Sequence, residues 1–177
     1  MPGSSGTKRY VLDVFALDAD SSSMKKESHI EGPMYDALVE ARAAAARGEV
    51  PVGAVVMHQG TRIAASGNRV EERLDPTAHA EILALREAAR VLATPYLEEC
   101  DLYVTLEPCA LCAAAISFFR VRRLYFGAYD PKGGAVDHGP RFYQQPTCHH
   151  RPHVYGGLSE LQCAEMLRAF FAKLRQD

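Results

Sequence analysis

Two short stretches of the sequence supply the residues of one metal site. The first, DPTAHAE at residues 75–81, opens a run with apolar residues at helical spacing. The second, TLEPCALC at residues 105–112, contains two cysteines separated by two residues. His79, Cys109 and Cys112 together make a set of three zinc ligands. A structural zinc ion normally has four protein ligands, whereas a catalytic zinc ion keeps one position for water, so this set predicts a catalytic zinc cofactor.

Glu81 lies beside this set and is not needed to complete it. With the ligands it forms the H-x-E…P-C-x-x-C pattern of zinc-dependent nucleobase deaminases. Bound zinc lowers the pKa of its water from about 15.7 to about 7, which provides a nucleophile for the ring carbon that bears the amino group. A carboxylate must then move protons to the ring nitrogen and to the departing ammonia, and Glu81 is the candidate.

The spacing of these residues also predicts local structure. His79 and Glu81 are two residues apart and would point to nearly opposite sides in the middle of a helix. We therefore expect His79 in the first turn of a helix, with zinc at the helix mouth. Cys109 is expected to open a second helix, because Pro108 precedes an alanine-rich run. Two helix N-termini facing the metal would favour the thiolates and a bound hydroxide.

A Cys-x-x-Cys pair has other uses, as a redox pair or as half of a structural zinc site. In the structural case Cys100, Cys148 or His149 would be the fourth ligand. The redox interpretation leaves His79 and Glu81 without a role. A zinc-stabilised RNA-binding module without catalysis is the alternative from a different class, and Glu81 argues against it because a structural site has no use for this carboxylate.

The composition fits a single domain. A chain of 177 residues is long enough for a sizeable core, and no apolar run is long enough to span a membrane. Five cysteines, two of them assigned to the metal, argue against a disulfide framework and for a reducing compartment, which predicts a cytoplasmic protein. Residues 1–33 are rich in Ser, Gly and charged residues and are expected to be a disordered extension, with the deaminase domain over residues 34–177.

The net charge of −2 hides an asymmetry. Residues 120–177 contain 9 Lys/Arg and 5 Asp/Glu, a net charge of +4, whereas residues 1–119 contain 11 and 17, a net charge of −6. The C-terminal third is therefore able to present a basic face to RNA. The alternative is that these charges are spread around a solvated surface.

Predicted helices and strands alternate along the domain. Helices are expected over residues 34–47, 79–93, 109–120 and 160–175, and strands over residues 51–58, 62–66, 101–106 and 121–129. Gln59-Gly60 is expected to form a hairpin turn, and residues 139–155 are expected to be irregular. Thr77, or a neighbour, and Ser159 are the expected helix caps. The alternation predicts an α/β fold with some parallel strand pairing.

Several strings resemble the bacterial tRNA-specific adenosine deaminases of the cytidine deaminase-like superfamily. They are EVPVGAV at residues 49–55, GNR at 67–69, YVTLEPC at 103–109 and RRLYFGAYDPKGGA at 122–135, with Phe170-Phe171 in the last helix. The resemblance covers about residues 34–175. It implies a three-layer α/β/α sandwich with a mixed central sheet of about five strands, acting as a homodimer. It also implies conversion of the wobble adenosine of an arginine tRNA to inosine, with ammonia released.

The resemblance implies roles for individual residues. His79, Cys109 and Cys112 should hold zinc, and Glu81 should move protons. Asn68 should hydrogen-bond the purine, while the main chain at Ala80 and Pro108 should help to orient the water and the leaving group. The residues that should face the RNA are Asp130, Lys132, His149, His150, Arg151, Phe170, Phe171 and Arg175.

The sequence departs from the family pattern at three positions. Leu111 stands where methionine is common, His138 where serine is common, and His149 where asparagine is common. The leucine conserves volume, and the two histidines change only the residues expected to face the RNA. A deaminase of a free base or nucleoside, such as guanine, cytosine or cytidine, would share the zinc site without a basic rim and is the competing enzyme hypothesis.

Overall fold

The computed structural model describes residues 32–175, so the extension expected over residues 1–33 lies almost entirely outside the described residues. One five-stranded sheet, with the order β2-β1-β3-β4-β5, forms the centre of the fold. Its strands are β1 (Gly53–His58), β2 (Thr61–Gly67), β3 (Cys100–Leu106), β4 (Arg123–Ala128) and β5 (His153–Tyr155). β1 pairs antiparallel with β2 and β3, whereas β3, β4 and β5 run parallel. The mixed sheet expected from the sequence is confirmed.

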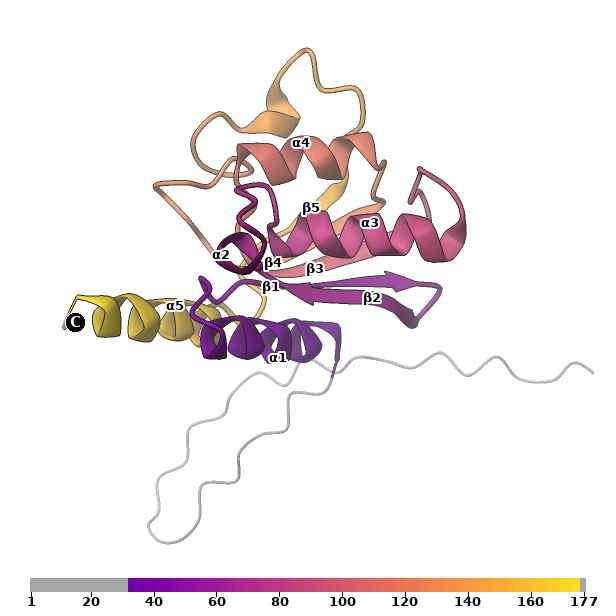
Figure 1. Cartoon of the computed structure of the whole chain (residues 1–177). Coiled ribbons are helices and arrows are strands. Elements are labelled where there is room, and N and C mark those ends of the chain that lie inside the picture. Colours follow the sequence, from indigo (N-terminus) through magenta and orange to yellow (C-terminus); the bar gives the residue numbers. More distant parts are fainter. Residues whose placement is uncertain (1–31, 176–177) are drawn as a thin grey trace, which may run out of the picture.

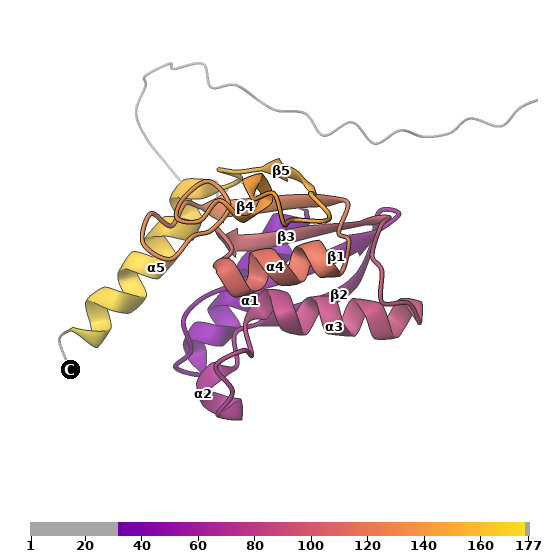
Figure 2. The same cartoon turned by 90° about the horizontal axis from the view of Figure 1, so that it is seen from above.

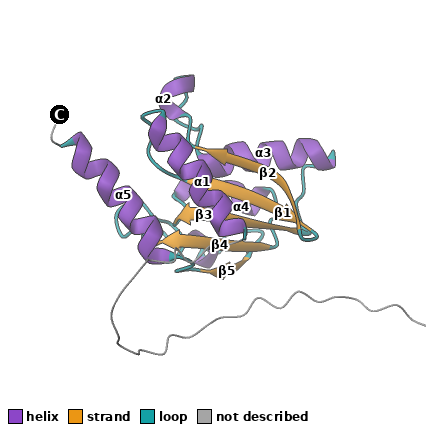
Figure 3. Ribbon diagram, turned by 90° about the horizontal axis from the view of Figure 1, so that it is seen from below, coloured by secondary structure: helices purple, strands orange, loops and turns teal. Residues whose placement is uncertain are grey.

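Helices cover both faces of the sheet, which makes the expected three-layer α/β/α sandwich. α1 (Pro33–Ala46) and α5 (Glu160–Leu174) lie on one face, and α3 (Ala80–Leu92) and α4 (Ala110–Phe118) lie on the other (Figure 1). Figure 2 shows α3 and α4 side by side above the strands, and Figure 3 shows α1 and α5 from below. Within residues 32–175, no helix combines the length and the apolar character needed to cross a bilayer.

Alternate side chains of the strands fill two separate apolar cores, as the pleat requires. On β1, Val55 packs in the same cluster as Leu38 of α1, whereas Ala54 and Val56 belong to the cluster on the opposite face. α1 approaches the sheet closely at the end of β2. A Cβ atom on Gly67 would lie 2.6 Å from the main-chain oxygen of Glu40, so only glycine fits here.

Most expected elements are present within two residues of their expected bounds, and Gln59-Gly60 forms the β1–β2 turn with both residues at positive φ. Two segments outside the expected helices and strands contain regular structure. Residues 70–73 form a short helix, α2 (Val70–Arg73), and residues 139–155 include a 3₁₀ helix, η1 (Phe142–Gln144), as well as β5. β5 has three residues, too few to show a hydrophobic period, and is defined by its pairing with β4.

Helix α4 is buried on one side only. Cys112, Ala113 and Ile116 are fully buried, but Leu111 and Phe118 are 42% and 71% exposed. Leu111, Ala114 and Phe118 lie three and four residues apart and therefore share one helix face. Within residues 32–175, this α4 stripe is an apolar surface that is exposed at Leu111 and Phe118 and half-buried at Ala114.

Candidate active site

The ends of several strands meet at one edge of the sheet. Asn68 follows β2, Cys109 lies shortly after β3, and Asp130 lies shortly after β4. These ends share an edge because β2, β3 and β4 run in the same direction. Ligands of open α/β sheets bind outside the carboxyl ends of the strands, so this edge is where a site is expected.

The three expected zinc ligands lie together at this edge. His79 is the N-cap residue of α3 and Cys109 is the N-cap residue of α4, as the motif spacing predicts. His79 Nδ1 lies 3.3 Å from Cys112 Sγ and 3.6 Å from Cys109 Sγ. A tetrahedral zinc ion with usual bond lengths would separate a nitrogen and a sulfur ligand by about 3.6 Å. The donor set therefore fits zinc.

The electrostatics of the three donors also suit a metal. A hydrogen bond from the Cys112 thiol lowers the pKa of Cys109 to about 4, and His79 adds to this shift. The same hydrogen bond, together with burial, raises the pKa of Cys112. A hydrogen bond with Cys109 raises the pKa of His79. The donors share protons that zinc would displace, because a coordinating thiol is fully deprotonated.

No fourth protein ligand completes this cluster in the described part of the chain. The ligand atoms of His79, Cys109 and Cys112 lie within 4.8 Å of one another, and the cluster contains no other histidine, cysteine or carboxylate. Cys148, one of the candidates for a structural site, instead donates its thiol to the His150 carbonyl at 3.1 Å. The open fourth position is the arrangement of a catalytic rather than a structural zinc site.

Glu81 lies in the first turn of α3, beside the ligands. It is 4% exposed, and it lines the same cavity as His79 and Cys109. Burial raises the pKa of its carboxyl group, while the neighbouring His79 opposes this shift. A buried carboxyl group with a raised pKa next to a metal site is a candidate for proton transfer.

Asn68 caps helix α3 from outside the helix. Its Oδ1 accepts a hydrogen bond of 2.8 Å from the main-chain N–H of Ala80, and the residue is buried at the cavity wall. The cap expected at Thr77 or a neighbour is wrong: the N-cap residue, His79, makes no side-chain capping hydrogen bond, and the hydroxyl and N–H of Thr77 both bind Asp75 Oδ1, at 2.7 and 2.8 Å. Because Oδ1 is directed at the Ala80 N–H, the amide NH₂ group of Asn68 keeps two donors that can bind a substrate acceptor.

The cap expected at Ser159 is also only partly correct. Ser159 is the N-cap residue of α5, but it adopts a left-handed conformation and its side chain makes no capping hydrogen bond.

At Pro108, the main-chain carbonyl accepts a hydrogen bond of 2.9 Å from the N–H of Ala135. The N–H of Ala80 already donates to Asn68 Oδ1. Contacts of the Ala80 and Pro108 main chain with the water and the leaving group stay predictions.

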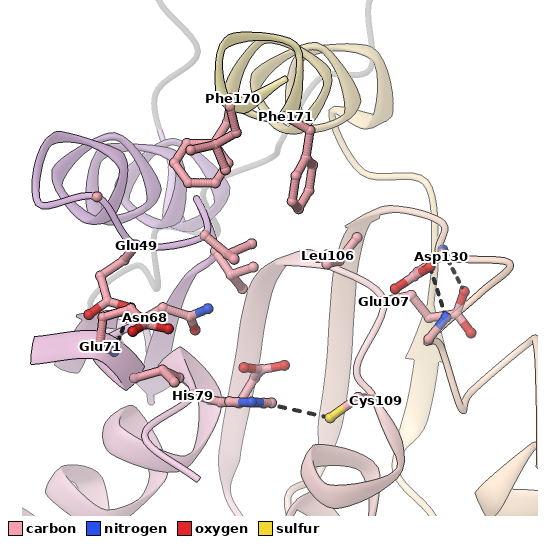
Figure 4. Close-up of a pocket in the computed structure, with 17 residues that line it drawn as sticks. Glu49, Asn68, Glu71, His79, Leu106, Glu107, Cys109, Asp130, Phe170 and Phe171 are labelled. Atoms are coloured by element: carbon pink, nitrogen blue, oxygen red, sulfur yellow. Dashed lines mark hydrogen bonds between the residues drawn. The ribbon is translucent and has the colours of Figure 1, made fainter. Parts of the chain in front are cut away.

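A cavity of about 520 Å³ opens above the metal cluster, within the size range of small-molecule sites. Figure 4 shows its wall, with His79 and Cys109 at the bottom and Phe170 and Phe171 directed into it from α5. The two phenylalanine rings pack edge to face at 5.4 Å, and Phe171 is 44% exposed. Neither ring is part of the buried core, so both are available to a ligand at the cavity mouth.

The other residues expected to face RNA fall into two groups. Asp130 lines the cavity, and Lys132 is exposed two residues further along the same turn, whereas Arg175 is exposed at the end of α5. His149, His150 and Arg151 do not line the cavity. The His150 ring nitrogen Nε2 donates a hydrogen bond of 2.7 Å to the carbonyl of Val121, just after α4. This segment thus lies beside the end of α4 that is remote from the metal.

The basic excess of the C-terminal third is partly neutralised. Arg120 pairs with Glu98 at 3.0 Å, and Arg122 and Arg123 pair with Asp101 at 2.9 and 3.6 Å. Three of the nine basic residues therefore bind acidic side chains at the opposite end of β3 from the metal. The basic face expected from the charge count is correspondingly smaller.

Two buried glutamates form part of the cavity wall and were not identified from the sequence. Glu49 accepts hydrogen bonds from the N–H groups of Glu71 and Glu72 at the start of α2, at 3.3 and 2.9 Å. Glu107 accepts hydrogen bonds from the loop after β4. Burial alone would raise the pKa of Glu107, but the N–H of Asp130 and further donors outweigh burial and lower it. For Glu107 the available signal was an acidic residue between Leu106 and Pro108, directly after β3.

Comparison with known proteins agrees with this geometry. The family model of the cytidine and deoxycytidylate deaminase zinc-binding region matches residues 27–128. A tRNA-specific adenosine deaminase of Agrobacterium fabrum is 61% identical over 141 residues, which cover 80% of this chain and 93% of that protein. A solved structure from a study of A-to-I editing by tRNA:A34 deaminases at the wobble position of transfer RNA is also 61% identical, with a TM-score of 0.75 over 76% of this chain and 98% of the other. A solved guanine deaminase of Nitrosomonas europaea is 28% identical, with a TM-score of 0.69 over 79% and 83% of the two chains.

Three zinc ligands at two helix N-termini, with a buried glutamate beside them, define a zinc-dependent deaminase of the cytidine deaminase-like fold. Its cofactor is zinc, with one ion per subunit. Within this class, the 61% identity shows that the chain belongs to the tRNA-specific adenosine deaminase family. The family indicated by the sequence strings is confirmed.

Proposed function

We propose that this protein hydrolytically deaminates the wobble adenosine of a tRNA anticodon loop to inosine and releases ammonia. The observation that carries the proposal is a three-ligand cluster with a buried carboxylate, Glu81, in one cavity, in a chain 61% identical to a tRNA-specific adenosine deaminase. The five cysteines are free, which supports placing the protein in the reducing cytoplasm with its substrate.

In the proposed reaction His79, Cys109 and Cys112 hold zinc, which supplies an activated water at neutral pH. Glu81 takes a proton from the water that adds to C6 of the adenine and passes it to ring N1. It then takes the remaining proton of the hydroxyl added at C6 and delivers it to the amino group, which leaves as ammonia as the C6 carbonyl forms. Asn68 directs its amide N–H groups at an acceptor of the substrate, since its oxygen caps α3. The atoms of adenosine and water balance those of inosine and ammonia.

We assign the cavity mouth to the RNA around the target base. An adenine in a duplex is out of reach of the metal, so the base must be splayed from a loop. Phe170 and Phe171 lie where neighbouring bases would stack, and Lys132 and Arg175 are exposed cations near the same edge. Asp130 completes this rim with its main chain and carboxylate. We propose an arginine tRNA as the natural substrate, which a panel of tRNAs with adenosine at the wobble position will test.

The substrate preference is the most direct test of the proposed function. A zinc-loaded enzyme should deaminate an anticodon stem-loop with adenosine at the wobble position far more efficiently than free adenosine. Stacking contributes about 1–3 kcal/mol per base, so two stacked bases correspond to one to several orders of magnitude in kcat/KM. Efficiency on the RNA should fall with salt, with a log–log slope of about −0.7 for each phosphate contacted. Mass spectrometry of the stem-loop measures the reaction.

Free guanine, cytosine and cytidine belong in the same assay, because solved guanine deaminases share the fold. Equal efficiency on free adenosine and on the stem-loop, without salt dependence, would contradict the assignment to tRNA. Efficient turnover of guanine or cytidine would favour a free-base or nucleoside deaminase.

We further propose that the enzyme is a homodimer that pairs through the α4 stripe of Leu111, Ala114 and Phe118. The stripe is apolar, and among residues 32–175 Leu111 and Phe118 are exposed, whereas Ala114 is half-buried. α4 begins at the metal and ends beside the segment 149–151. A two-fold axis perpendicular to α4 would pack two copies of the helix antiparallel. The segment 149–151 of each subunit would then lie near the cavity of its partner, which accounts for its distance from its own cavity.

The substitution Phe118→Glu should make the protein monomeric. Burying an unpaired carboxylate in an apolar interface costs several kcal/mol, so the dissociation constant should rise by about two orders of magnitude or more. Light scattering coupled to size-exclusion chromatography gives the mass. The matched control is Leu161→Glu, because Leu161 is 74% exposed on α5 and lies outside the stripe. A dimer that survives Phe118→Glu, or is lost equally in both variants, would refute this interface.

A further inference from the structure

One buried carboxylate gathers the main chain of an entire loop. The side chain of Glu107 is 0% exposed. Its Oε1 accepts hydrogen bonds from the N–H groups of Val136, Asp137 and His138, at 3.2, 2.9 and 3.0 Å. Its Oε2 accepts one from the N–H of Asp130 at 3.0 Å and contacts His138 Nδ1 at 2.7 Å. Two oxygens therefore bind both ends of the loop 130–138.

The same loop is attached to the strand end that carries the first cysteine ligand. The N–H of Ala135 donates to the carbonyl of Pro108 at 2.9 Å, and Gly134 forms a β-bridge with Cys109. A Cβ atom on Gly134 would lie 2.5 Å from Glu107 Cδ, so the backbone is pressed against the carboxylate. The loop is thus built around Glu107, at the base of the cavity wall.

The part of the loop that Glu107 holds faces the cavity. Asp130 and Gly133 line the wall. The Asp130 carboxylate shapes the turn that follows, because its Oδ1 accepts the N–H groups of Lys132 and Gly133, each at 3.0 Å. Glu107 fixes the main chain of Asp130, and Asp130 in turn fixes the position of Lys132. Figure 4 shows Glu107 next to Asp130 and away from the cavity centre.

We propose that Glu107 is a positioning residue for RNA binding, which sets the loop 130–138 against the metal-ligand segment so that the cavity rim is formed before the substrate arrives. This inference rests on the proposed function, since it assigns the loop to the RNA. Both carboxylate oxygens of Glu107 bind groups of this loop, so in this proposal it acts on the RNA through the loop. A preformed rim lowers the entropy cost of binding, so its loss should raise KM more than it lowers kcat.

The substitution Glu107→Gln tests the proposal with little change in volume. A glutamine places an NH₂ group against main-chain N–H donors that now bind a carboxylate oxygen, so at least one donor loses its acceptor. Amide hydrogen exchange, measured by mass spectrometry on the zinc-loaded chain, should become at least about tenfold faster across residues 130–138. KM for the anticodon stem-loop should rise about tenfold with kcat within about threefold of the wild type, and zinc content should stay at one equivalent.

Asp101→Asn is the matched control. Asp101 is a carboxylate of β3, the strand that Glu107 directly follows, and it binds Arg122 and Arg123 at the end of β3 remote from the metal site. It should leave exchange in the loop and KM unchanged. If Glu107→Gln does not fold, His138→Ala removes one contact of the same carboxylate and should give a smaller increase in exchange and KM.

The outcomes separate this inference from the proposed function. Unchanged exchange across residues 130–138 in Glu107→Gln overturns the positioning role, whatever the activity. Faster exchange with an unchanged KM for the stem-loop overturns the link between the loop and the RNA. If the wild-type enzyme fails on the stem-loop, the proposed function fails, while the exchange measurement still decides whether Glu107 holds the loop.

Discussion

The substitution Glu81→Ala should keep the fold and the zinc ion but abolish turnover. The carboxylate is 4% exposed in the cavity beside the three metal ligands and is not one of them. Loss of a positioned acid–base group typically costs about two to four orders of magnitude in rate. The loss should reach the upper end or exceed it, because one group serves proton transfer from water, to N1 and to ammonia. Inosine formation in single-turnover reactions, followed by mass spectrometry, measures it.

Two variants control this experiment. Glu81→Gln keeps the volume of the buried side chain and should be equally inactive, since an amide cannot carry the protons. Glu87→Ala removes a partly exposed glutamate of the same helix, whose ion-pair partner within residues 32–175 is Arg90, and should retain full activity. Zinc is measured in all variants by elemental analysis. A near-wild-type rate in Glu81→Ala at full zinc content would show that another group moves the protons.

The metal cluster could be predicted because its geometry is encoded by short spacings. His79 and Glu81 are two residues apart, and this separation required a helix to begin at the histidine, as α3 does. Pro108 before an alanine-rich run predicted the start of α4 at Cys109 in the same way. Both arguments use only the geometry of one helical turn. Tertiary structure then had only to bring the two helix N-termini together.

The rest of the cavity depends on contacts between residues far apart in the sequence. The hydrogen bonds of Glu107 reach partners 23 to 31 residues away, and those of Glu49 reach 22 and 23 residues away. A buried glutamate next to a strand end does not reveal which N–H groups it will bind. The cap of α3 could not be predicted for the same reason. Asn68, which binds the Ala80 N–H, follows β2 and lies 12 residues before Ala80, whereas Thr77 binds Asp75 instead.

The exposed face of α4 also could not be predicted from the sequence. The sequence of a helix with so few polar residues favours burial against the sheet or against a partner. One face meets the sheet side of the fold through Cys112 and Ile116, but Phe118 is 71% exposed. An apolar helix has no polar stripe that would mark its outer face, so the pattern cannot separate intramolecular from intermolecular burial. Here the fold covers half of the helix, and the proposed homodimer would cover the rest.

Loss of the metal is the second large effect, and the substitution Cys112→Ser should produce it. Cys112 is fully buried in the first turn of α4, with its Sγ 3.3 Å from His79 Nδ1. A serine hydroxyl stays protonated at neutral pH and is a poor zinc ligand, whereas a cysteine binds as the thiolate. Zinc should fall well below one equivalent, and deamination should be lost. The melting temperature should fall as well, since binding to a folded site contributes to stability.

The control for this substitution is Cys148→Ser. Cys148 is a buried cysteine outside the cluster, and its thiol already lies in hydrogen-bonding range of the His150 carbonyl and the Ser117 hydroxyl, which a serine can also bind. This variant should keep one equivalent of zinc and most of its activity. It also tests the structural-site alternative, in which Cys148 was a candidate fourth ligand. A full equivalent of tightly held zinc in Cys112→Ser would contradict the ligand set, and loss of zinc in Cys148→Ser would restore a four-ligand structural site.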